Sequence, residues 1–489
     1  MDPDAVWGSG YCKFFLSTRT GKSGGMENLR MSEQKKTWSV GTLTYTSGAL
    51  IALFAWLLWG DFAWAMKDRA IGPAATLLIS KLDVSETLYS LIIISYPNFT
   101  NIFLCPIISY ISDRHRGKFG RRIPFLLFTT PFIVIGAIGL GFSPRLGTML
   151  CDALGGSLSL NACKLIAFAV FWASLDFGQT QAGALASALY NDVVPREVLG
   201  RFFALFRAIS LFAGMLFNWY LMKPVETHYE LIFLGVGLLY GIGLLSMCWK
   251  VKEGEYPPPP ELPRNADGSA LSPVQRIVKP FAAYFRQSFS VPYYRWVIAA
   301  LVFGGLAATP YNMYAIRYAK GIGMDMGDYG KICAVTYLIS FCISYPLGWL
   351  ADRFHPLRMS ILSLIVYLGT MILGGCFTNS HFTFGLFLLL HGVFSGCYFT
   401  LSASLGAKLF PRSLFAQFNS ANAMILALAN TCLAMVFGAI IDALGGNYIC
   451  VFWFGALTTV TAVVILLRVY RDYLRLGGDT SYAAPDPGE

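Results

Sequence analysis

Several ionisable side chains lie inside stretches of sequence that are otherwise apolar. They are Asp61, Lys67, Asp68, Arg69, Asp176, Arg207, Arg317 and His391. A charged group at the centre of a bilayer costs about 2.5–3.5 kcal/mol on insertion scales, so it is usually kept inside a helix bundle for a functional reason. Carboxylates and imidazoles at that depth bind polar solutes or carry protons. No metal-site, nucleophile or ATP-binding motif accompanies them, so we expect neither an enzyme nor a cofactor.

Aromatic and amide side chains lie near these charges in the sequence. Aromatic faces stack on the C–H faces of a sugar ring, and carboxylates and amides bind its hydroxyls. We therefore expect a substrate site made of Asp68, Trp64, Asp176, Gln179, Arg207, Tyr311 and Asn312. We expect Asp61 and His391 to couple transport to a cation. Because 15% of the residues are aromatic, chance placement of some of these rings stays open.

Each candidate also has a purely structural interpretation. Asp61 and Asp68 could form only a buried salt bridge with Lys67 or Arg69. Asp176 could anchor one helix to a neighbour, Arg207 could be an ordinary charge at the cytoplasmic mouth, and His391 a satisfied buried polar group. The sequence leaves these alternatives open.

A strongly basic loop, Ser112–Pro124, lies between two long apolar runs. It contains Asp113, Arg114, Arg116, Arg121 and Arg122, and its excess of positive charge predicts a cytoplasmic position. A weaker copy with Asp352 and Arg353 follows 239 residues later (352 minus 113). We interpret these residues as a conformational latch, in which the Asp113 carboxylate pairs with arginines or a helix N-terminus only in an outward-open state.

Twelve apolar runs must position these side chains. They lie near 43–80, 86–111, 123–143, 164–190, 202–222, 229–249, 295–319, 329–351, 358–377, 382–407, 415–441 and 449–469. Each is long enough to cross a bilayer as a helix of about 20 residues. The fold class expected is an all-α integral membrane protein with two pseudo-symmetric six-helix bundles, since a repeated loop indicates a repeated bundle. The expected parts are a tail (1–42), a bundle (43–249), a cytoplasmic linker (250–294), a second bundle (295–470) and a tail (471–489).

Two local features are less regular. The first run continues past Lys67-Asp68-Arg69, so we expect one long helix bent at Pro73, rather than a helix ending at Met66. Ser143–Cys163 is expected to be an additional outer loop. Cys151 and Cys163 flank its centre, and they are either bridged or two free thiols at helix ends.

Composition excludes other classes of protein. Hydrophobic residues make up 55% of the chain and charged residues 13%, which is typical of a polytopic membrane protein. The net charge of +10 follows the positive-inside rule, so no nucleic-acid partner is expected. We expect a monomer in the lipid bilayer of the plasma membrane (the inner membrane if the source is bacterial), with both termini cytoplasmic and no secretory signal.

The basic loop between the second and third runs resembles the signature loop of the major facilitator superfamily. Ala65–Gly72 with Phe119–Pro124 looks like the glycoside–pentoside–hexuronide:cation symporters, and Leu175-Asp176 with Asn191-Asp192 is similar to their sucrose-transporter relatives. The resemblance implies a sugar carboxylate at Asp68 and a site around Asp176. Asn101 and Cys105 replace the cation-binding aspartates of the melibiose-type members, and Ser187 replaces an arginine of the sucrose-type members.

The sequence thus predicts a secondary transporter that moves a sugar or glycoside by alternating access, with proton rather than sodium symport. An exporter of drugs or amphipathic metabolites is the main alternative, and a membrane sensor that binds a solute is another. The partners expected are a small-molecule solute, a coupling cation and lipid.

Overall fold

A computed structural model describes residues 37–256, 258, 289–411 and 415–485. Within them, twelve helical segments are long and apolar enough to cross a membrane. In chain order the elements are β1 (Trp38–Val40), β2 (Leu43–Tyr45), α1 (Ser47–Ile79), η1 (Ser80–Leu82), α2 (Glu86–Tyr89), η2 (Ser90–Ser95), α3 (Tyr96–Arg114), α4 (Ile123–Ala153), α5 (Leu160–Val193), α6 (Arg196–Leu216), η3 (Phe217–Leu221), α7 (Val225–Lys250), α9 (Pro292–Leu306), α10 (Thr309–Gly321), α11 (Met326–Phe354), α12 (Pro356–Phe377), α13 (His381–Ser402), α14 (Leu405–Leu409), α15 (Phe415–Ala443), α16 (Cys450–Arg475) and α17 (Gly478–Ser481).

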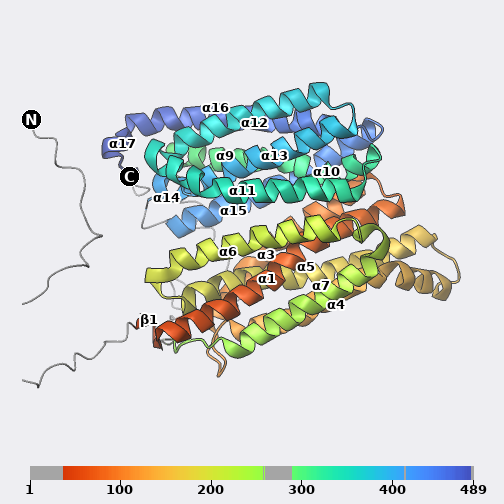
Figure 1. Cartoon of the computed structure of the whole chain (residues 1–489), viewed down its shortest axis with the longest axis horizontal. Coiled ribbons are helices and arrows are strands. Elements are labelled where there is room, and N and C mark those ends of the chain that lie inside the picture. The colour runs from red at the N-terminus through yellow and green to blue at the C-terminus, as the bar shows by residue number, and fades with distance from the viewer. Residues whose placement is uncertain (1–36, 257, 259–288, 412–414, 486–489) are drawn as a thin grey trace, which may run out of the picture.

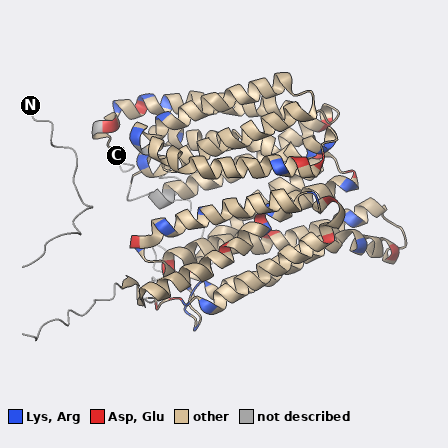
Figure 2. Ribbon diagram, viewed as in Figure 1, with Lys and Arg blue, Asp and Glu red and all other residues tan. Residues whose placement is uncertain are grey.

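The helices form two bundles that lie side by side with their long axes roughly parallel (Figure 1). The first contains α1 to α7 and the second α9 to α16. We call the end that carries Lys250 and Pro292, where α7 ends and α9 begins, the linker end, and the opposite end the far end. Charged residues gather at these two ends, and the middle of the helices is largely free of them (Figure 2). This distribution is the one expected of helices that cross a bilayer.

Close helix packing holds each bundle together. In the first bundle α4 packs along α5 and α1 along α7, and in the second α12 packs along α16. Gly136 in α4 permits a close approach, because a Cβ added there would lie 2.5 Å from the backbone nitrogen of Leu175 in α5. Small residues at such contacts let helix backbones approach within a membrane.

Helix α1 confirms the prediction of one long helix. It runs from Ser47 to Ile79 with Pro73 inside, and the Thr46 side chain caps its first turn. Asp61 and Lys67 therefore lie in the middle of one continuous helix, and both are buried. The alternative, in which the helix ends at Met66 and the charges lie in a loop, is wrong.

Two other spans are interrupted. The second begins as α2, passes through the π-helix η2 and continues as α3, in which Pro97 occupies the first turn. The seventh breaks between α9 and α10 at Ala307 and Ala308, just before Pro310. Proline has no backbone N–H to continue the hydrogen-bond ladder, so helices break or widen next to it. The second break places the start of α10 beside the space between the bundles.

The predicted outer loop Ser143–Cys163 is wrong. Helix α4 continues to Ala153 and α5 begins at Leu160, so only residues 154–159 connect them. Pro144 lies within α4 instead of ending it, and Ser159 caps α5 through the N–H of Ala162. Cys151 and Cys163 lie in the two helices as free thiols. The proline run of the predicted linker lies almost wholly outside the described residues.

Candidate functional site

A cavity of about 600 Å³ lies between the two bundles. Five helices line it: α1 and α6 from the first bundle, and α10, α11 and α13 from the second. The side chains with hydrogen-bonding groups are Arg69, Arg207, Asn312, Tyr329, Thr336, Tyr337, Ser340, Ser344, His391, Ser395 and Thr400. A cavity of this size and polarity suits a small polar solute.

Two arginines form the wall on the side of the first bundle. Arg69 donates to the Tyr337 hydroxyl (2.9 Å) and to Ser210 Oγ (3.3 Å), and its guanidinium lies 4.9 Å from the Tyr337 ring centroid. It thereby bridges α1 and α6 to α11 of the other bundle. Among the described residues, no carboxylate lies within ion-pair distance of Arg69 or Arg207. The cavity therefore offers two cationic donors to the acceptors of a solute.

On the opposite wall, Asn312 and His391 form a hydrogen-bonded chain with Tyr367. His391 Nε2 donates to the Asn312 amide oxygen (2.9 Å), since that oxygen only accepts. Nδ1 then accepts from the Tyr367 hydroxyl at 2.8 Å. Both nitrogens of a neutral imidazole are thus satisfied. His391 is therefore a buried polar group with both ring nitrogens hydrogen-bonded, which is the structural alternative given for it above. Its hydrogen bond orients Asn312, which lines the cavity.

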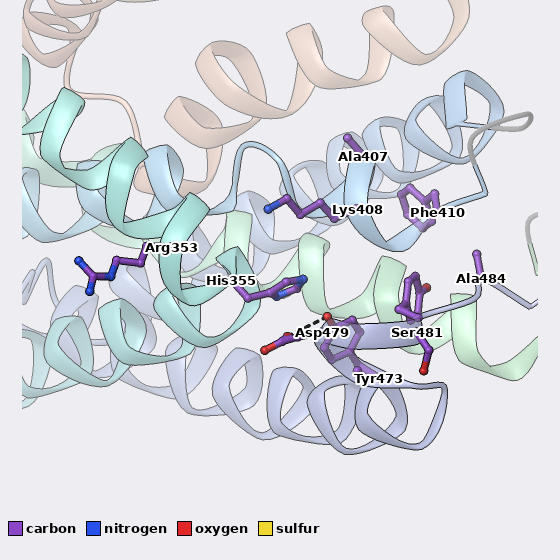
Figure 3. A pocket seen from close by; sticks show the side chains of 11 residues that line it. Arg353, His355, Ala407, Lys408, Phe410, Tyr473, Asp479, Ser481 and Ala484 are labelled. Atoms are coloured by element: carbon purple, nitrogen blue, oxygen red, sulfur yellow. Dashed lines mark hydrogen bonds between the residues drawn. The ribbon is translucent and has the colours of Figure 1, made fainter. Parts of the chain in front are cut away.

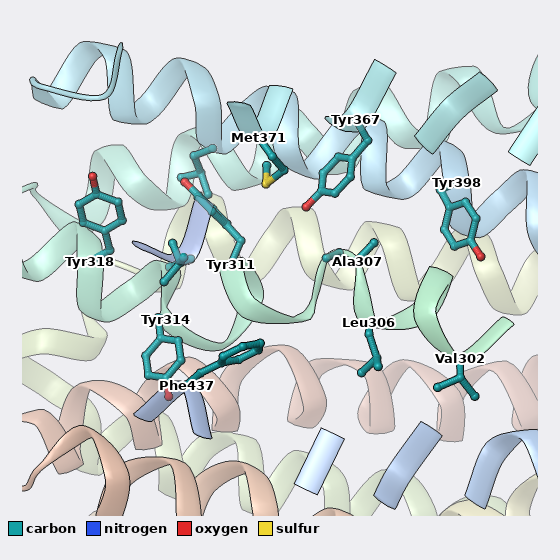
Figure 4. Close-up of a cluster of buried hydrophobic side chains, with 14 of the residues drawn as sticks. Val302, Leu306, Ala307, Tyr311, Tyr314, Tyr318, Tyr367, Met371, Tyr398 and Phe437 are labelled. Carbon is teal, nitrogen blue, oxygen red and sulfur yellow. The ribbon is translucent and has the colours of Figure 1, made fainter. Parts of the chain in front are cut away.

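Tyr311 does not line the cavity. It is fully buried in the second bundle, 4.2 Å from the His391 ring centroid and stacked near Phe384. Figure 4 shows Tyr311 and Tyr367 within the cluster of buried side chains around α10 and α12. Tyr311 therefore supports His391 by packing and is placed away from a solute in the cavity.

A second polar cluster lies within the first bundle, and the Asp68 side chain that belongs to it is 48% exposed. Lys67 is only 1% exposed, and its ammonium group contacts Asp68 Oδ1 (2.5 Å), Gln179 Oε1 (3.0 Å) and the Trp64 ring face (4.1 Å to the centroid). Trp64 Nε1 donates to the other Asp68 oxygen at 2.8 Å. The structure thus brings Trp64, Asp68 and Gln179 together around Lys67. It also pairs Asp68 with Lys67, which the salt-bridge interpretation of the sequence allowed.

Asp176 extends this cluster toward α3. It accepts hydrogen bonds from Thr100 Oγ1 (2.5 Å), Thr180 Oγ1 (3.4 Å) and Gln179 Nε2 (3.5 Å). Its buried carboxylate is therefore held by neutral donors from two helices. Among the described residues, none of α5 lines the cavity, so neither Asp176 nor Gln179 contacts that space.

Asp61 differs from the other acidic residues of the bundle. It is 1% exposed, and its Oδ2 has no hydrogen-bond partner in the described part of the chain. Within the same residues no basic group lies within ion-pair distance of it. Buried polar atoms without partners are rare in proteins, so each requires an explanation.

Inspection of the sequence did not select Arg69 or Tyr337 as site residues. Arg69 is one of three consecutive charges in the first apolar run, of which only the neighbouring Asp68 is predicted as a site residue. Three consecutive residues of a helix point in three directions about 100° apart, so only the packing shows which one faces the cavity. Tyr337 carries no sequence signal that separates it from the other 24 tyrosines of the 25 in the chain.

Ion pairs and hydrogen bonds join the two bundles at the far end. Arg317 Nη2 pairs with Glu86 Oε1 (2.6 Å), and both side chains are at most 10% exposed. Asp442 accepts hydrogen bonds from the backbone N–H groups of Glu86 (2.8 Å) and Thr87 (2.9 Å). Lys320 also pairs with Glu226 across the two bundles. In the described residues, every ion pair that joins the bundles lies at this end.

The linker end of the first bundle has a separate ion-pair network. Asp192 lies between Arg121 (2.6 Å) and Arg122 (3.3 Å), and Arg122 also pairs with Asp113. Arg116 donates to the carbonyl oxygens of Asp113 and His115, and Arg114 lies over the Tyr110 ring. Asp113 is therefore paired with Arg122 in a structure whose bundles are joined by ion pairs at the far end, and the latch role of these residues stays a prediction.

In the second copy of this loop, Arg353 lies over the rings of Trp349 and Phe354. The side chain of Asp352 lies outside the described residues.

Comparison with known proteins places the sequence among transporters. The sequence profile of MFS/sugar transport proteins matches residues 76–411. The sucrose transport protein SUC3 of Arabidopsis thaliana is 29% identical over 161 residues, which is 32% of this chain and 26% of that protein. SUT5 of Oryza sativa subsp. indica is 30% identical over 164 residues, 32% of this chain and 30% of that protein. These matches cover about a quarter to a third of the length of the curated relatives.

Solved structures show the same fold. A bacterial homologue of the human lysosomal transporter Spinster, in an inward-facing and unoccupied conformation, aligns with a TM-score of 0.59 at 13% identity, over 87% of this chain and 96% of that one. The xylose transporter XylE of E. coli, in an inward open conformation, aligns with a TM-score of 0.55 at 14% identity, over 86% and 95%. The predicted class of twelve membrane helices in two bundles is thereby confirmed.

Proposed function

The chain belongs to the MFS/sugar transport protein family, and from this membership we propose that it moves a sugar or glycoside across the membrane by alternating access, with proton symport. The observation that carries the proposal is the cavity between the bundles. It lies between two bundles that are joined at the far end by Arg317–Glu86 and are not joined by ion pairs at the linker end, as far as the described residues show. The basic loops make the linker end cytoplasmic.

The lining of the cavity favours a sugar over an amphipathic solute. About half of its side chains carry hydrogen-bonding groups, and they come from both bundles. Arg69 and Arg207 donate from one wall, and Asn312 presents its amide from the other, where His391 fixes its orientation. A polyol has hydroxyl groups on both edges of its ring, so it is bound by donors and acceptors that face each other across the cavity.

Asp61 is the proposed proton carrier. Its carboxyl group takes up and releases a proton without disturbing an ion pair, because no described basic group neutralises it. Asp68, in contrast, is tied to Lys67, and Asp176 accepts three hydrogen bonds from neutral donors. A proton needs a single carboxyl group, whereas a sodium ion needs several oxygen ligands at once.

The test is uptake by the full chain in liposomes. A panel of radiolabelled neutral and acidic sugars is offered with an imposed inward pH gradient or an imposed sodium gradient. We expect the pH gradient to drive accumulation of at least one sugar and a protonophore to abolish it. Accumulation driven by sodium at constant pH would contradict the choice of ion, and absence of uptake of every sugar would contradict the substrate class.

Two variants locate the functions. Arg207→Gln should weaken substrate binding about tenfold, since it removes a charge-assisted hydrogen bond. Arg145→Gln is its matched control, because Arg145 is 69% exposed and pairs with Glu230 at the far end. Asp61→Asn should retain exchange of internal for external sugar and lose accumulation against a gradient. Normal accumulation by that variant would exclude Asp61 as the proton carrier.

A further inference from the structure

A second cavity, of about 690 Å³, opens at the linker end of the second bundle. It lies between the end of α11, the start of α12, the end of α14, and the segment that follows α16 (Figure 3). The side chains with ionisable groups are those of Arg353, His355, Lys408, Tyr473, Asp479 and Tyr482. We call it the Lys408 cavity. It is separated from the central cavity and shares no lining residue with it.

Positive charge dominates the Lys408 cavity. Its one acidic side chain, Asp479, is neutralised by Arg358 Nη2 (2.9 Å) and accepts a hydrogen bond from the Tyr473 hydroxyl (3.0 Å). Lys408 is exposed and has no carboxylate within ion-pair distance in the described part of the chain. Arg353 lies at the edge, with its side chain extended away from Lys408 in Figure 3. The cavity therefore lacks an anion to balance Lys408.

The first bundle shows what a balanced version of this place looks like. Asp192 lies three residues before Pro195 at the end of α5, and Lys408 lies three residues before Pro411 at the end of α14. Likewise Arg122 is the N-cap residue of α4, and His355 is the N-cap residue of α12. The first bundle thus has the Asp192 carboxylate between two arginines, and at the corresponding position the second bundle has Lys408, which lines the cavity.

The segments after the last helix of each bundle correspond as well. Glu253 and Tyr256 follow α7 with the same spacing of three as Asp479 and Tyr482 after α16. Glu253 accepts hydrogen bonds from the backbone N–H groups that start α4. Asp479 instead pairs with Arg358. At the start of α12 the backbone N–H of Leu357 therefore donates to the His355 ring and not to a carboxylate.

His355 is held in an unusual conformation that directs its ring to the cavity. Its φ of 68° and ψ of 129° lie in a region that side chains of L-residues rarely adopt. Nδ1 accepts from the Leu357 N–H (3.3 Å), so a neutral ring keeps its proton on Nε2. Burial lowers the pKa of His355, and Lys408 lowers it further. Strained backbone of this kind is found at ligand sites.

We propose that the Lys408 cavity binds a phosphate-bearing ligand, whose phosphate supplies the negative charge that the Asp192 carboxylate supplies in the first bundle. Lys408 supplies the counter-charge and His355 a neutral N–H donor. The volume exceeds what one phosphate group fills and suits a phosphorylated small molecule. A lipid headgroup offers the same chemistry from the membrane surface, so the experiment distinguishes the two sources.

The experiment uses the full chain in nanodiscs of phosphatidylcholine. Inorganic phosphate and glucose 6-phosphate are titrated by calorimetry, with chloride at matched ionic strength as the control for screening. A second set of nanodiscs contains phosphatidic acid, and thermal unfolding is followed without soluble ligand. The variants are Lys408→Asp, which restores the charge found in the first bundle, and the milder Lys408→Gln. Lys331→Gln is the matched control, an exposed lysine paired with Asp328 near the far end.

We expect wild type and Lys331→Gln to bind a soluble phosphate probe, or to be stabilised by phosphatidic acid, and both Lys408 variants to bind at least about tenfold more weakly. A response to the soluble probe assigns a soluble ligand, and a response to phosphatidic acid alone assigns a lipid headgroup. Equal responses of wild type and Lys408→Gln, or no response of wild type to any probe, would overturn the proposal. If Lys408→Asp does not fold, Lys408→Gln decides.

Discussion

The far end and the linker end of the molecule use their charged residues differently. At the far end, Arg317–Glu86 and Lys320–Glu226 join one bundle to the other. At the linker end, the pairs around Asp192 stay within the first bundle, and the pair Arg358–Asp479 stays within the second. Ion pairs at the far end therefore stabilise the contact between the two bundles. Ion pairs at the linker end stabilise the fold of each bundle separately.

This difference separates two consequences of breaking an ion pair. Arg122 is 7% exposed and Asp192 14%, and Glu86 and Arg317 are buried to a similar degree. Burial makes the loss of one partner costly in both places, since a poorly exposed charge then loses compensation. Breaking the pair of Arg122 and Asp192 lowers the free energy of unfolding of the first bundle. Breaking the pair of Glu86 and Arg317 shifts the equilibrium between conformations of the two bundles.

Asp192→Asn is the strongest test of the linker end. It leaves Arg121 and Arg122 with only the half-exposed Asp113 as an acidic partner among the described residues, so we expect a loss of about 3 kcal/mol of stability. Thermal unfolding of the purified protein measures it. Asp113→Asn is the control, because Asp113 is 54% exposed and should lose less than about 1 kcal/mol. Equal losses would mean that burial does not distinguish the two carboxylates.

Glu86→Gln tests the far end. It should leave stability nearly unchanged and favour opening of the far end, because the pair with Arg317 exists only when the bundles meet. The buried Ser90, replaced by cysteine in a background without exposed cysteines, reports the opening by its labelling rate. We expect about a tenfold increase. Lys320→Gln, whose lysine is 44% exposed, should change the rate by a smaller factor. If both variants labelled alike, exposure would not set the strength of the contact.

Glu253→Ala sharpens the comparison within the linker end. Glu253 accepts hydrogen bonds from the backbone N–H groups of Arg121 (3.0 Å), Arg122 (2.8 Å) and Ile123 (2.8 Å). It is thus the cap of α4, and its loss should reduce stability by about 1 kcal/mol. The measurement is again thermal unfolding. Glu255→Ala, at an exposed position two residues on, should have no effect, and a matching loss there would exclude capping as the cause.

The smallest expected effect is a pH dependence confined to the second bundle. The pKa of His355 is lowered by burial first and by Lys408 second, so the folded state takes up its proton less readily than the unfolded state. Stability from this group is present above the unfolded pKa of about 6.5 and is lost as the pH falls below it. His355→Asn should flatten the decline in unfolding temperature between about pH 7 and 5. The same slope in both proteins would exclude His355.

Much of the architecture was predictable because membrane helices have strong sequence signals. The apolar runs predicted all twelve spans, and the long first helix followed from apolar residues beyond Arg69. The extent of α4 was not predictable in the same way. Pro144 reads as the end of a helix, but a proline within a packed membrane helix is tolerated when its neighbours satisfy the freed carbonyl groups.

The site was predictable in composition and less so in arrangement. Arg207, Asn312 and His391 line the central cavity, while Asp68, Trp64, Asp176 and Gln179 gather in a separate cluster around Lys67. The sequence predicted that the residues around Lys67 would face the same central cavity as Arg207 and Asn312. The direction of each side chain depends on the rotation of its helix, and the sequence of a nearly all-apolar helix records that rotation weakly.

The sequence by itself determined the membrane class, the number of spans, the repeat of the two basic loops and the short list of buried charges, because hydropathy and charge act residue by residue along the chain. Only the tertiary structure decided which charges pair. In the tertiary structure Asp68 pairs with Lys67, and Arg69 donates a hydrogen bond to Tyr337. Asp61 Oδ2 has no hydrogen-bond partner among the described residues. The tertiary structure also showed Lys408 where the first bundle has Asp192 between two arginines. Pairing depends on distances of a few ångströms between helices that are far apart in the chain, and those distances are set by packing.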